Sequence, residues 1–573
     1  MLKRLKSVSM MLFLMGASTG AAYAVSNPGI TDVKIAQQDG ACTGIVKDAT
    51  GETVIGASVV VKGTTNGTIT GIDGDFSLSN VKKGDVIVIS FVGYISQEIV
   101  WDGKPVNVTL KDDTQTLDEV VVVGYGTQKK VNVTGAVGMV DSKVIAARPV
   151  QNVSQALQGV IPGLNLTVGN SGGSLDGEMN INIRGTGTIG DGSGSSPLVL
   201  IDGIEGNLNT VNPNDIESVS VLKDAASASI YGARASFGVI LVTTKSGKSG
   251  KTNVNYSGNV RFNDAIGIPE LMDSYTFAQY FNRASSNRGG GDIFSPAVME
   301  RIKAYQEGTL TATTVDNGSG IWQKWANANG NTDWFGEFYD NWVPSQEHNL
   351  SISGGTEKLQ YVLSGSFLDQ KGLLRHGTDK FQRYTLNSKI TANITDWLKV
   401  TLNSKWTRED FQRPTYLTSS FFHNLARKWP VHPAYDPNGF PMDEGEIEQM
   451  ENGGEQNSQK DYYTNQLHVV IEPIKNWRIN LEGSVRTTTQ YQHWEVLPVH
   501  AYDVNGDPYY TVWDMGYGSY SAGSSRVDEY SWKENYYTTN IYSDYFKQFD
   551  NGHYFKVMQV SMPSFTRTAV LKL

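Results

Sequence analysis

The sequence predicts a mostly β protein with three parts: a small β-sandwich, a compact α+β unit, and the antiparallel strands of a membrane β-barrel. Three observations predict this fold class. Short apolar runs separated by glycine-containing reversals fill residues 43–112. Strand and helix patterns alternate over residues 127–248. From residue 249 onward, long segments alternate between apolar and polar residues with a period of two.

Residues 1–24 have the pattern of a signal peptide that is removed after export. Three basic residues precede a short apolar stretch, and Ala22-Tyr23-Ala24 provides a small-residue cleavage site. A membrane-spanning helix is the alternative, but the apolar stretch is too short to cross a bilayer. Cys42 is the only cysteine, so no disulfide can form within the chain.

Composition and motifs argue against nucleic-acid binding and catalysis. The 573 residues include 48 basic and 58 acidic side chains, a net charge of −10, whereas nucleic-acid binding requires a basic face. The eight histidines lack metal-ligand spacing, and no serine lies in a G-x-S-x-G elbow. Residues 185–190 match the dinucleotide motif G-x-G-x-x-G, but a glycine–serine loop comes next where a helix is required. We therefore expect no enzyme activity, no cofactor, no metal site and no nucleic-acid partner.

Residues 43–112 predict a small, non-catalytic β-sandwich. Its strand-like runs are 59–61, 86–89 and 106–110. Asp73-Gly74-Asp75 has calcium-binding residue types, but a calcium loop needs more oxygen ligands at alternate positions, so we expect a turn. The pattern G-x-V-x-D…G-A-x-V-x-V-x-G-T…G-x-F over residues 44–76 resembles the carboxypeptidase-regulatory-like domain. That resemblance implies an accessory module.

Residues 117–126, Leu-Asp-Glu-Val-Val-Val-Val-Gly-Tyr-Gly, lie between the sandwich and the α+β unit. Four consecutive valines favour an extended backbone, and acids and glycines bound the run on its two sides. On these residues alone, two interpretations stay open. The run is either an ordinary buried strand or a strand left available to pair with the sheet edge of a partner.

Residues 127–248 predict the α+β unit. Its expected helices cover 154–158 and 224–231, and its expected strands cover 179–183, 198–201, 219–222 and 238–244. We expect three of its charged residues, Arg184, Asp202 and Arg234, to pair within the unit in a structural role.

Residues 249–558 predict barrel strands. The nine expected strands are 252–262, 346–354, 357–369, 380–394, 397–410, 460–472, 476–491, 533–548 and 552–558. Their links alternate between tight turns and longer connections, and 263–345, 411–459 and 492–532 are very long. An outer-membrane barrel has short periplasmic turns and long outer loops, whereas a globular sandwich has no reason to place every long link at one end.

The first long link, 263–345, is rich in tryptophan, phenylalanine and tyrosine. Exposed aromatic rings there would suit sugar rings or a protein lid. The alternative is that most of them pack a small core of the link itself.

Four segments resemble the SusC/RagA family of TonB-linked outer-membrane transporters. They are 117–126, the Asn-Ile-Arg-Gly of 182–185, the Pro-Leu-Val-Leu-Ile-Asp-Gly of 197–203, and 216–245 with its Val-Leu-Lys-Asp-Ala and Ile-Tyr-Gly-Ala-Arg-Ala. These segments cover the α+β unit closely. The likeness extends with less specificity into the strands beyond it.

The resemblance implies that residues 127–248 are a plug inside a barrel of 22 strands and that 115–126 is the TonB box. The implied partners are TonB with its energising inner-membrane complex, and a SusD-like surface lipoprotein acting as a lid. The implied function is import of glycans or oligopeptides across the outer membrane. The TonB-binding residues would be Leu117, Asp118, Glu119, Val120, Val121, Val122, Val123, Gly124 and Tyr125. The residues with a structural role in the plug would be Arg184, Gly185, Asp202, Gly203 and Arg234, and the candidates for cargo contact are Asn170, Ser171, Trp322 and Trp325.

The carboxyl-terminal end departs from the family pattern. Nine strands is an odd number, whereas a bacterial barrel has an even one. Alternation stops after Met558, and residues 559–573 contain Pro563 and lack a terminal aromatic strand. We therefore expect 559–573 to be an aberrant tail of a truncated or frame-shifted product. Two further functions stay open for the chain: an outer-membrane signalling receptor, and a surface binding protein without transport.

Overall fold

The computed structural model divides the chain into two compact units, residues 1–118 and 119–573. It describes residues 40–572, except for 49–50, 65, 92–93, 112–119, 123–126, 130–135, 149, 169–173, 176, 186–195, 443–444, 512–522, 550–552 and 562–563. The predicted signal peptide therefore lies outside the described residues. Strands predominate in both units, as the sequence predicts.

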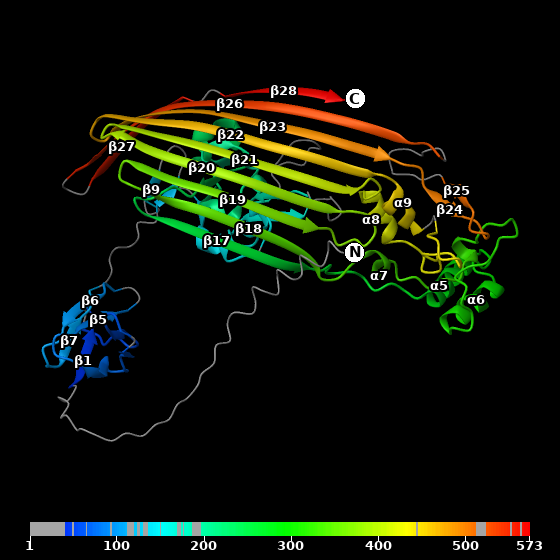
Figure 1. The fold of residues 1–573 in the computed structure, drawn as a ribbon, viewed down its shortest axis with the longest axis horizontal. Helices are drawn as coiled ribbons and strands as arrows, with labels where there is room; N and C mark the ends of the chain where they lie inside the picture. Colours follow the sequence, from blue (N-terminus) through cyan, green and yellow to red (C-terminus); the bar gives the residue numbers. More distant parts are fainter. Residues whose placement is uncertain are drawn as a thin grey trace, which may run out of the picture. The chain divides into compact units, whose positions relative to one another are not determined.

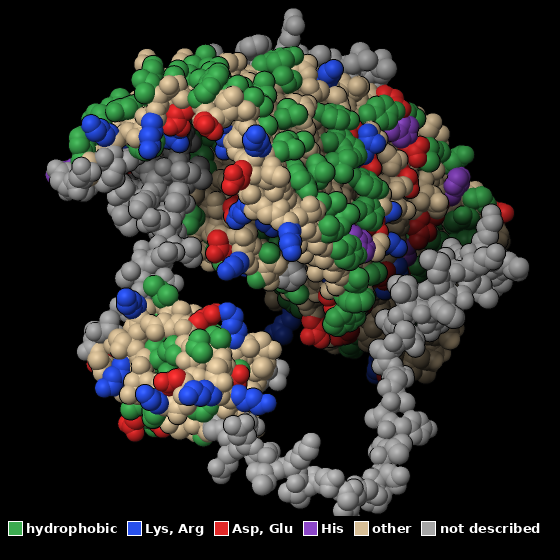
Figure 2. All heavy atoms as spheres, turned by 60° about the vertical axis from the view of Figure 1, so that its left-hand side comes forward, with side chains coloured by type: hydrophobic (Ala, Val, Ile, Leu, Met, Phe, Trp, Pro, Cys, Tyr) green, Lys and Arg blue, Asp and Glu red, His purple; other side chains and the backbone are tan. Residues whose placement is uncertain are grey.

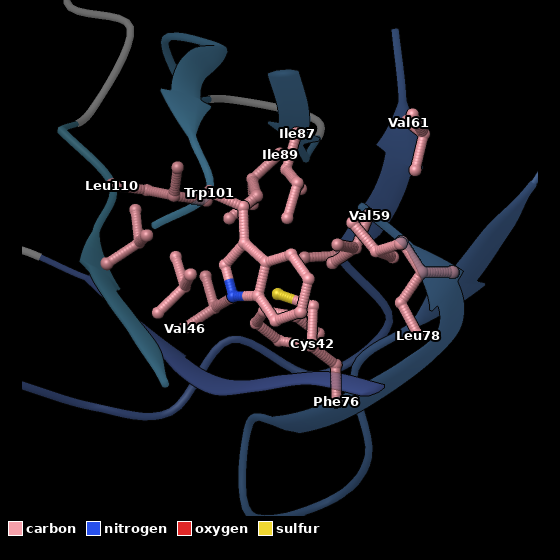
Figure 3. Packing of buried hydrophobic residues seen from close by; sticks show 14 of the residues in the cluster. Cys42, Val46, Val59, Val61, Phe76, Leu78, Ile87, Ile89, Trp101 and Leu110 are labelled. Atoms are coloured by element: carbon pink, nitrogen blue, oxygen red, sulfur yellow. The ribbon is translucent and has the colours of Figure 1, made fainter. Parts of the chain in front are cut away.

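The first unit is a β-sandwich of two sheets. One sheet has the order β4-β1-β7 and the other has the order β3-β2-β5-β6. Their bounds are β1 Gly40–Lys47, β2 Ser58–Val61, β3 Gly67–Ile69, β4 Asp75–Val81, β5 Val86–Ser90, β6 Gln97–Val100 and β7 Val106–Thr109. The indole ring of Trp101 lies in the core beside Cys42, Ile87 and Ile89 (Figure 3), all three of which are fully buried. Asp73 and Gly74 form the turn before β4, as predicted.

The α+β unit has a five-stranded sheet with the order β10-β15-β16-β13-β14. The strands are β10 Val137–Asp141, β13 Leu198–Ile201, β14 Ile204–Glu205, β15 Ile216–Leu222 and β16 Val239–Thr244. A separate hairpin joins β11 Leu164–Val168 to β12 Met179–Ile183, and β8 Val120–Val122 pairs with β9 Thr127–Lys129. Fully buried residues of the five-stranded sheet and of a neighbouring helix, such as Val219, Ile240 and Leu157, share one apolar core.

Short helices connect these strands. They are α2 Ser142–Ala146, α3 Val153–Leu157, η2 Leu208–Thr210, η3 Pro213–Asp215, α4 Ala225–Ala228 and η4 Ser229–Ala235, where η denotes a 3-10 helix. The helix predicted at 154–158 is α3. The helix predicted at 224–231 is the short α4 followed by the first part of the 3-10 helix η4, and it ends at Gly232 as predicted, because Gly232 has a φ of 63° and interrupts helical geometry.

Ten further strands form one antiparallel sheet, here called the large sheet, and the α+β unit lies against one of its faces (Figure 1). Along this sheet the strands keep their sequence order as far as β27. The bounds are β17 Gly250–Asn263, β18 Val343–Gly355, β19 Leu359–Lys371, β20 Lys380–Thr395, β21 Leu398–Pro414, β22 Glu455–Ile474, β23 Trp477–Val496, β26 Arg526–Gln548, β27 Tyr554–Ser561 and β28 Ser564–Lys572. All nine predicted strands are therefore present.

The sheet continues past Met558. β27 runs to Ser561, and β28 pairs with the part of β26 that β27 leaves uncovered, from Ser564 opposite Thr538 to Lys572 opposite Tyr530. The alternation pattern did not predict β28, which corrects the expected end of the strand region at residue 558.

The long links lie together at one end of the large sheet and the tight turns at the other (Figure 1), as the sequence predicts. The long links hold α5 Ser274–Asn287, α6 Pro296–Gln306, η5 Trp325–Asn327, α7 Trp334–Phe338, α8 Ser419–Leu425, α9 Ile447–Asn452 and the hairpin of β24 His500–Tyr502 with β25 Pro508–Tyr510. Within the described residues, no helix is both long enough and apolar enough to cross a membrane.

The two faces of the large sheet differ in polarity. On β20, Arg383 and Thr385 are buried against the α+β unit, while Leu386 and Ile394 on the other face are 57 % and 58 % exposed. The exposed face carries a broad area of hydrophobic side chains (Figure 2). Buried polar and exposed apolar side chains are the reverse of what a water-soluble sandwich shows, and they are typical of a barrel wall in lipid.

Candidate functional site

The site is the contact between the α+β unit and the large sheet, and its centre is the turn Asp202-Gly203. This turn joins β13 to β14, where Ile201 pairs with Ile204. Both turn residues have positive φ, 50° at Asp202 and 87° at Gly203. An Asp-Gly pair favours this two-residue turn because both residue types tolerate left-handed geometry. The sequence therefore places a carboxylate at the tip of a tight hairpin.

The carboxylate of Asp202 joins the α+β unit to two strands of the large sheet. It accepts hydrogen bonds from the backbone N–H of Thr244 at 2.9 Å and from the Thr244 hydroxyl at 2.7 Å, both within the α+β unit. From β20 of the large sheet, Lys389 Nζ lies 3.3 Å away. From β21, Asn403 Nδ2 donates at 3.0 Å and Lys405 Nζ forms a close ion pair. These residues are called the Asp202 cluster below.

This ion cluster is buried, and burial affects both the pKa of Asp202 and the free energy lost when one partner is removed. Burial alone would raise the pKa of Asp202, but the charges of Lys405 and Lys389 outweigh burial and hold that pKa well below its ordinary value. The Asp202 and Lys389 side chains are each only 9 % exposed. Removing one partner of such a pair leaves an uncompensated buried charge, which typically costs about 3–5 kcal/mol.

Hydrogen bonds from the large sheet to backbone carbonyls also hold the α+β unit. Arg383 donates to the carbonyls of Asn209 at 2.8 Å and Gln151 at 2.6 Å. Gln466 donates through Nε2 to the carbonyl of Asp202 at 3.0 Å. Carbonyl acceptors are present whatever the side chain, so these contacts recognise the backbone path of the unit.

Two more contacts extend this interface. Arg486 of β23 donates to the backbone carbonyl of Glu205 in β14. Asn212 of the α+β unit donates to the Asn349 side chain of β18 at 2.6 Å. Together with the Asp202 cluster, they distribute the attachment of the unit over widely separated strands of the sheet.

Two cavities border the Asp202 cluster at the contact between the α+β unit and the large sheet. The first has a volume of about 240 Å³ and is lined by Lys405, Thr244 and Arg486 among others. The second has a volume of about 370 Å³, and its lining includes Asp202 and Lys389. The interface is therefore incompletely filled next to the hydrogen-bonded contacts that hold it.

The charged plug residues predicted to pair within the unit have different partners in the structure. The guanidinium of Arg234 lies 3.5 Å from the Glu205 carboxylate within the unit, and it also donates to the Tyr536 hydroxyl of the large sheet at 3.3 Å. Asp202 pairs outward, with Lys389 and Lys405 of the large sheet, which corrects the expectation that it pairs inside the unit. No sequence signal indicated this pairing, because a lysine on the polar face of a strand looks like any other solvated residue.

Arg184 and Gly185 lie directly after β12. Both have positive φ, 61° and 96°. The backbone N–H of Arg184 donates to the carbonyl of Gly163 at 2.8 Å, which ties the end of β12 to the start of β11. The role of Arg184 and Gly185 visible in these contacts is thus in backbone geometry.

Only part of the predicted TonB-binding segment can be placed. Val120, Val121 and Val122 form β8, opposite Lys129, Gln128 and Thr127 of β9. Leu117, Asp118, Glu119, Val123, Gly124 and Tyr125 lie outside the described residues, as do the cargo candidates Asn170 and Ser171.

Some aromatic residues of the first long link are buried in a core, whereas others are partly or half exposed. Trp334 and Phe338 are fully buried and pack a core shared with α8 and α9. Trp325 is 50 % exposed, has a φ of 54° that is rare for a bulky residue, and stands edge-on to His432 at 4.3 Å between ring centroids. Trp322 is partly buried and forms a backbone bridge with Asp316.

Comparison with known proteins identifies the domains. The model of the TonB-dependent receptor plug domain matches residues 129–239, and the model of the CarboxypepD_reg-like domain matches residues 42–122. The TonB-dependent receptor SusC of Bacteroides thetaiotaomicron is 37% identical over 375 residues, which are 63% of this chain and 33% of SusC. The TonB-dependent receptor P39 of Formosa agariphila is 33% identical over 393 residues, which are 68% of this chain and 34% of P39. The chain thus spans about a third of the length of these curated relatives.

Solved structures show the same fold. The RagAB peptide importer in its open-open state superposes with a TM-score of 0.61 at 23% identity, covering 79% of this chain and 50% of that chain. The matched domains, their order along the chain, and the fold agree with each other. The chain belongs to the TonB-dependent receptors of the SusC/RagA type.

Proposed function

We propose that the chain acts in TonB-dependent import of large nutrients, glycans or oligopeptides, across the outer membrane. The observation that supports this most is the polarity of the large sheet. Its apolar face is exposed, and its polar face binds a separate α+β plug through a buried ion cluster. A wall that faces lipid and encloses a detachable plug is what a gated importer requires.

In the proposed mechanism, cargo binds on the side of the long links, above the plug. The valine segment, with residues Leu117 to Tyr125, then pairs with TonB in the periplasm by strand addition, and the inner-membrane complex pulls on it. A SusD-like lipoprotein covers the long links as a lid. Support for these partners is the resemblance to SusC and RagAB, together with the strand geometry of Val120–Val122.

The test is to replace Val120, Val121, Val122 and Val123 together by serine in the full-length protein. Serine keeps the length of the segment but lowers its tendency to form a strand. Energised uptake should be abolished while binding of cargo to intact cells is retained.

Replacing the exposed ion pair Lys62 and Glu98 of the sandwich by alanines is the matched control. It alters the neighbouring domain and leaves the valine segment unchanged, so uptake should be normal. Unchanged uptake in the serine variant would refute the assignment of this segment.

A further inference from the structure

A buried histidine joins three separate links at the end of the large sheet that carries the long links. His376 lies between β19 and β20 and is 6 % exposed. Its Nδ1 atom lies 2.7 Å from Oε1 of Glu451, in α9, and its Nε2 atom lies 3.2 Å from Oε1 of Glu337, in α7. Because α7 and α9 belong to two different long links, one imidazole ring connects all three.

The number of protons follows from the two contacts. A neutral imidazole has one N–H and one lone pair, whereas an ionised carboxylate only accepts hydrogen bonds. Both ring nitrogens can donate to carboxylate oxygens only when the cluster holds one proton more than a neutral imidazole with two ionised carboxylates does. Imidazole is a stronger base than carboxylate, so this proton belongs on the ring. With that proton on the ring, His376 donates to both carboxylates.

The charged groups around the ring are mostly acidic. Besides Glu337 and Glu451, Glu448 of α9 contributes a negative charge that acts on Glu451 and is itself opposed by His500. Near α7, Asp340 forms an ion pair of 3.0 Å with Arg375, the residue before His376. Carboxylates thus outnumber cations in this cluster.

One aromatic side chain, Phe338, contacts His376, and a second, Tyr435, contacts its partner Glu337. The ring of Phe338 stands edge-on to the imidazole at 5.3 Å between centroids and shields it from water. Burial and the hydrogen bond to Glu337 raise the pKa of Tyr435 to about 12, so its hydroxyl stays a donor and contacts Glu337 at 3.0 Å. Glu337 therefore remains an acceptor between two donors, the tyrosine hydroxyl and the imidazolium.

We propose that His376 is a proton-dependent clasp that fixes α7, the link 372–379 and α9 to one another. When the ring loses its proton, one of the two hydrogen bonds is lost, and a carboxylate then faces a nitrogen lone pair. The apolar core around Trp334 and Ile447 still holds α7 and α9, so the change is a loosening of the links rather than their unfolding. This role is independent of which cargo the protein carries.

Hydrogen exchange of the full chain in detergent tests the clasp. Exchange rates are measured at pH 5.5 and pH 8.0, corrected for the intrinsic effect of pH on amide exchange, for peptides covering α7, 372–379 and α9. Because hydrogen bonds to charged groups are among the stronger ones in proteins, protection should fall roughly tenfold or more at the higher pH. In His376→Gln, protection should be equally low at both pH values, since glutamine does not titrate.

Two further variants keep the test decisive. Glu451→Gln, at a side chain that is 43 % exposed, removes one carboxylate without disturbing the core, and it should also reduce the pH effect. His493→Gln changes a histidine of β23 that lies 2.7 Å from Glu529, outside these three segments, and it should leave the pH effect on them in place. A wild-type chain with equal protection at both pH values, or an effect that persists in His376→Gln, would overturn the proposal.

Discussion

Replacing Asp202 by asparagine should loosen the plug. Asparagine keeps the size of the side chain and an oxygen that accepts from Thr244, but it removes the negative charge that faces Lys389 and Lys405. Two lysines would then share a buried site without a counter-charge. Removing one partner of a buried pair costs about 3–5 kcal/mol, and we expect the hairpin of β13 and β14 to open more readily by that amount.

Hydrogen exchange of the backbone amides in β13, β14 and β16 measures this opening directly. Because about 1.4 kcal/mol corresponds to a factor of ten, protection in Asp202→Asn should fall roughly 100-fold or more. Adding Lys405→Met should restore part of the loss, since one of the two uncompensated charges is then gone.

The matched control is Lys62→Met in the sandwich. Its ion pair with Glu98 is about half-exposed, at 57 % and 50 %. The loss of this pair should lower the free energy of opening within the sandwich by less than about 1 kcal/mol, and it should leave the exchange of β13, β14 and β16 unchanged. A fall of less than tenfold in Asp202→Asn, or no recovery on adding Lys405→Met, would show that the ion cluster does not hold the plug.

Three other changes have defined outcomes. Burial, reinforced by the charges of Lys428 and Lys324, lowers the pKa of His432 from 6.5 to about 3. The backbone next to it, residues 429–433, should therefore lose stability as the pH falls from 6.5 toward 3, by about 1.4 kcal/mol per pH unit. His432→Leu should flatten this dependence in hydrogen exchange of that segment. Trp101→Ala should destabilise the sandwich by about 3–5 kcal/mol in denaturant titrations, without shifting the transition of the second unit. Leu386→Arg, on the exposed apolar face, should lower the free energy of unfolding in liposomes by about 2–4 kcal/mol. A sheet that faces water would tolerate the same change.

The strands of the large sheet were predictable because a period-two pattern survives wherever one face is apolar. Their ends were less predictable. β22 begins at Glu455 and β26 at Arg526, whereas the pattern places these starts at residues 460 and 533. In these first residues neither strand has one apolar and one polar face, so alternation disappears while the backbone ladder continues. Weak alternation likewise hid β28 from sequence-based prediction.

Within the plug, local signals worked where the cause was local. Asn152 caps α3 by accepting from the backbone N–H of Gln155, and Asp224 caps α4 by accepting from Ser227, so both helix starts follow from short-range hydrogen bonds. The end of the second helix at Gly232 was also predictable, but the second helical turn that follows the kink, up to Ala235, was not. A glycine at a helix end and one within a kinked segment look alike in a sequence.

The ion cluster shows where a single sequence stops being informative. The turn geometry at Asp202 has a local cause, because an Asp-Gly pair favours a tight hairpin. Its partners Lys389 and Lys405 are 187 and 203 residues away. On the inner face of a barrel most positions are polar, so a lysine that binds the plug and a lysine that faces water fit the pattern equally well. The distinction depends on which residue the hairpin tip reaches after folding. A charged residue at the tip of a tight plug hairpin therefore predicts a buried partner on the wall, but only the assembled sheet identifies that partner.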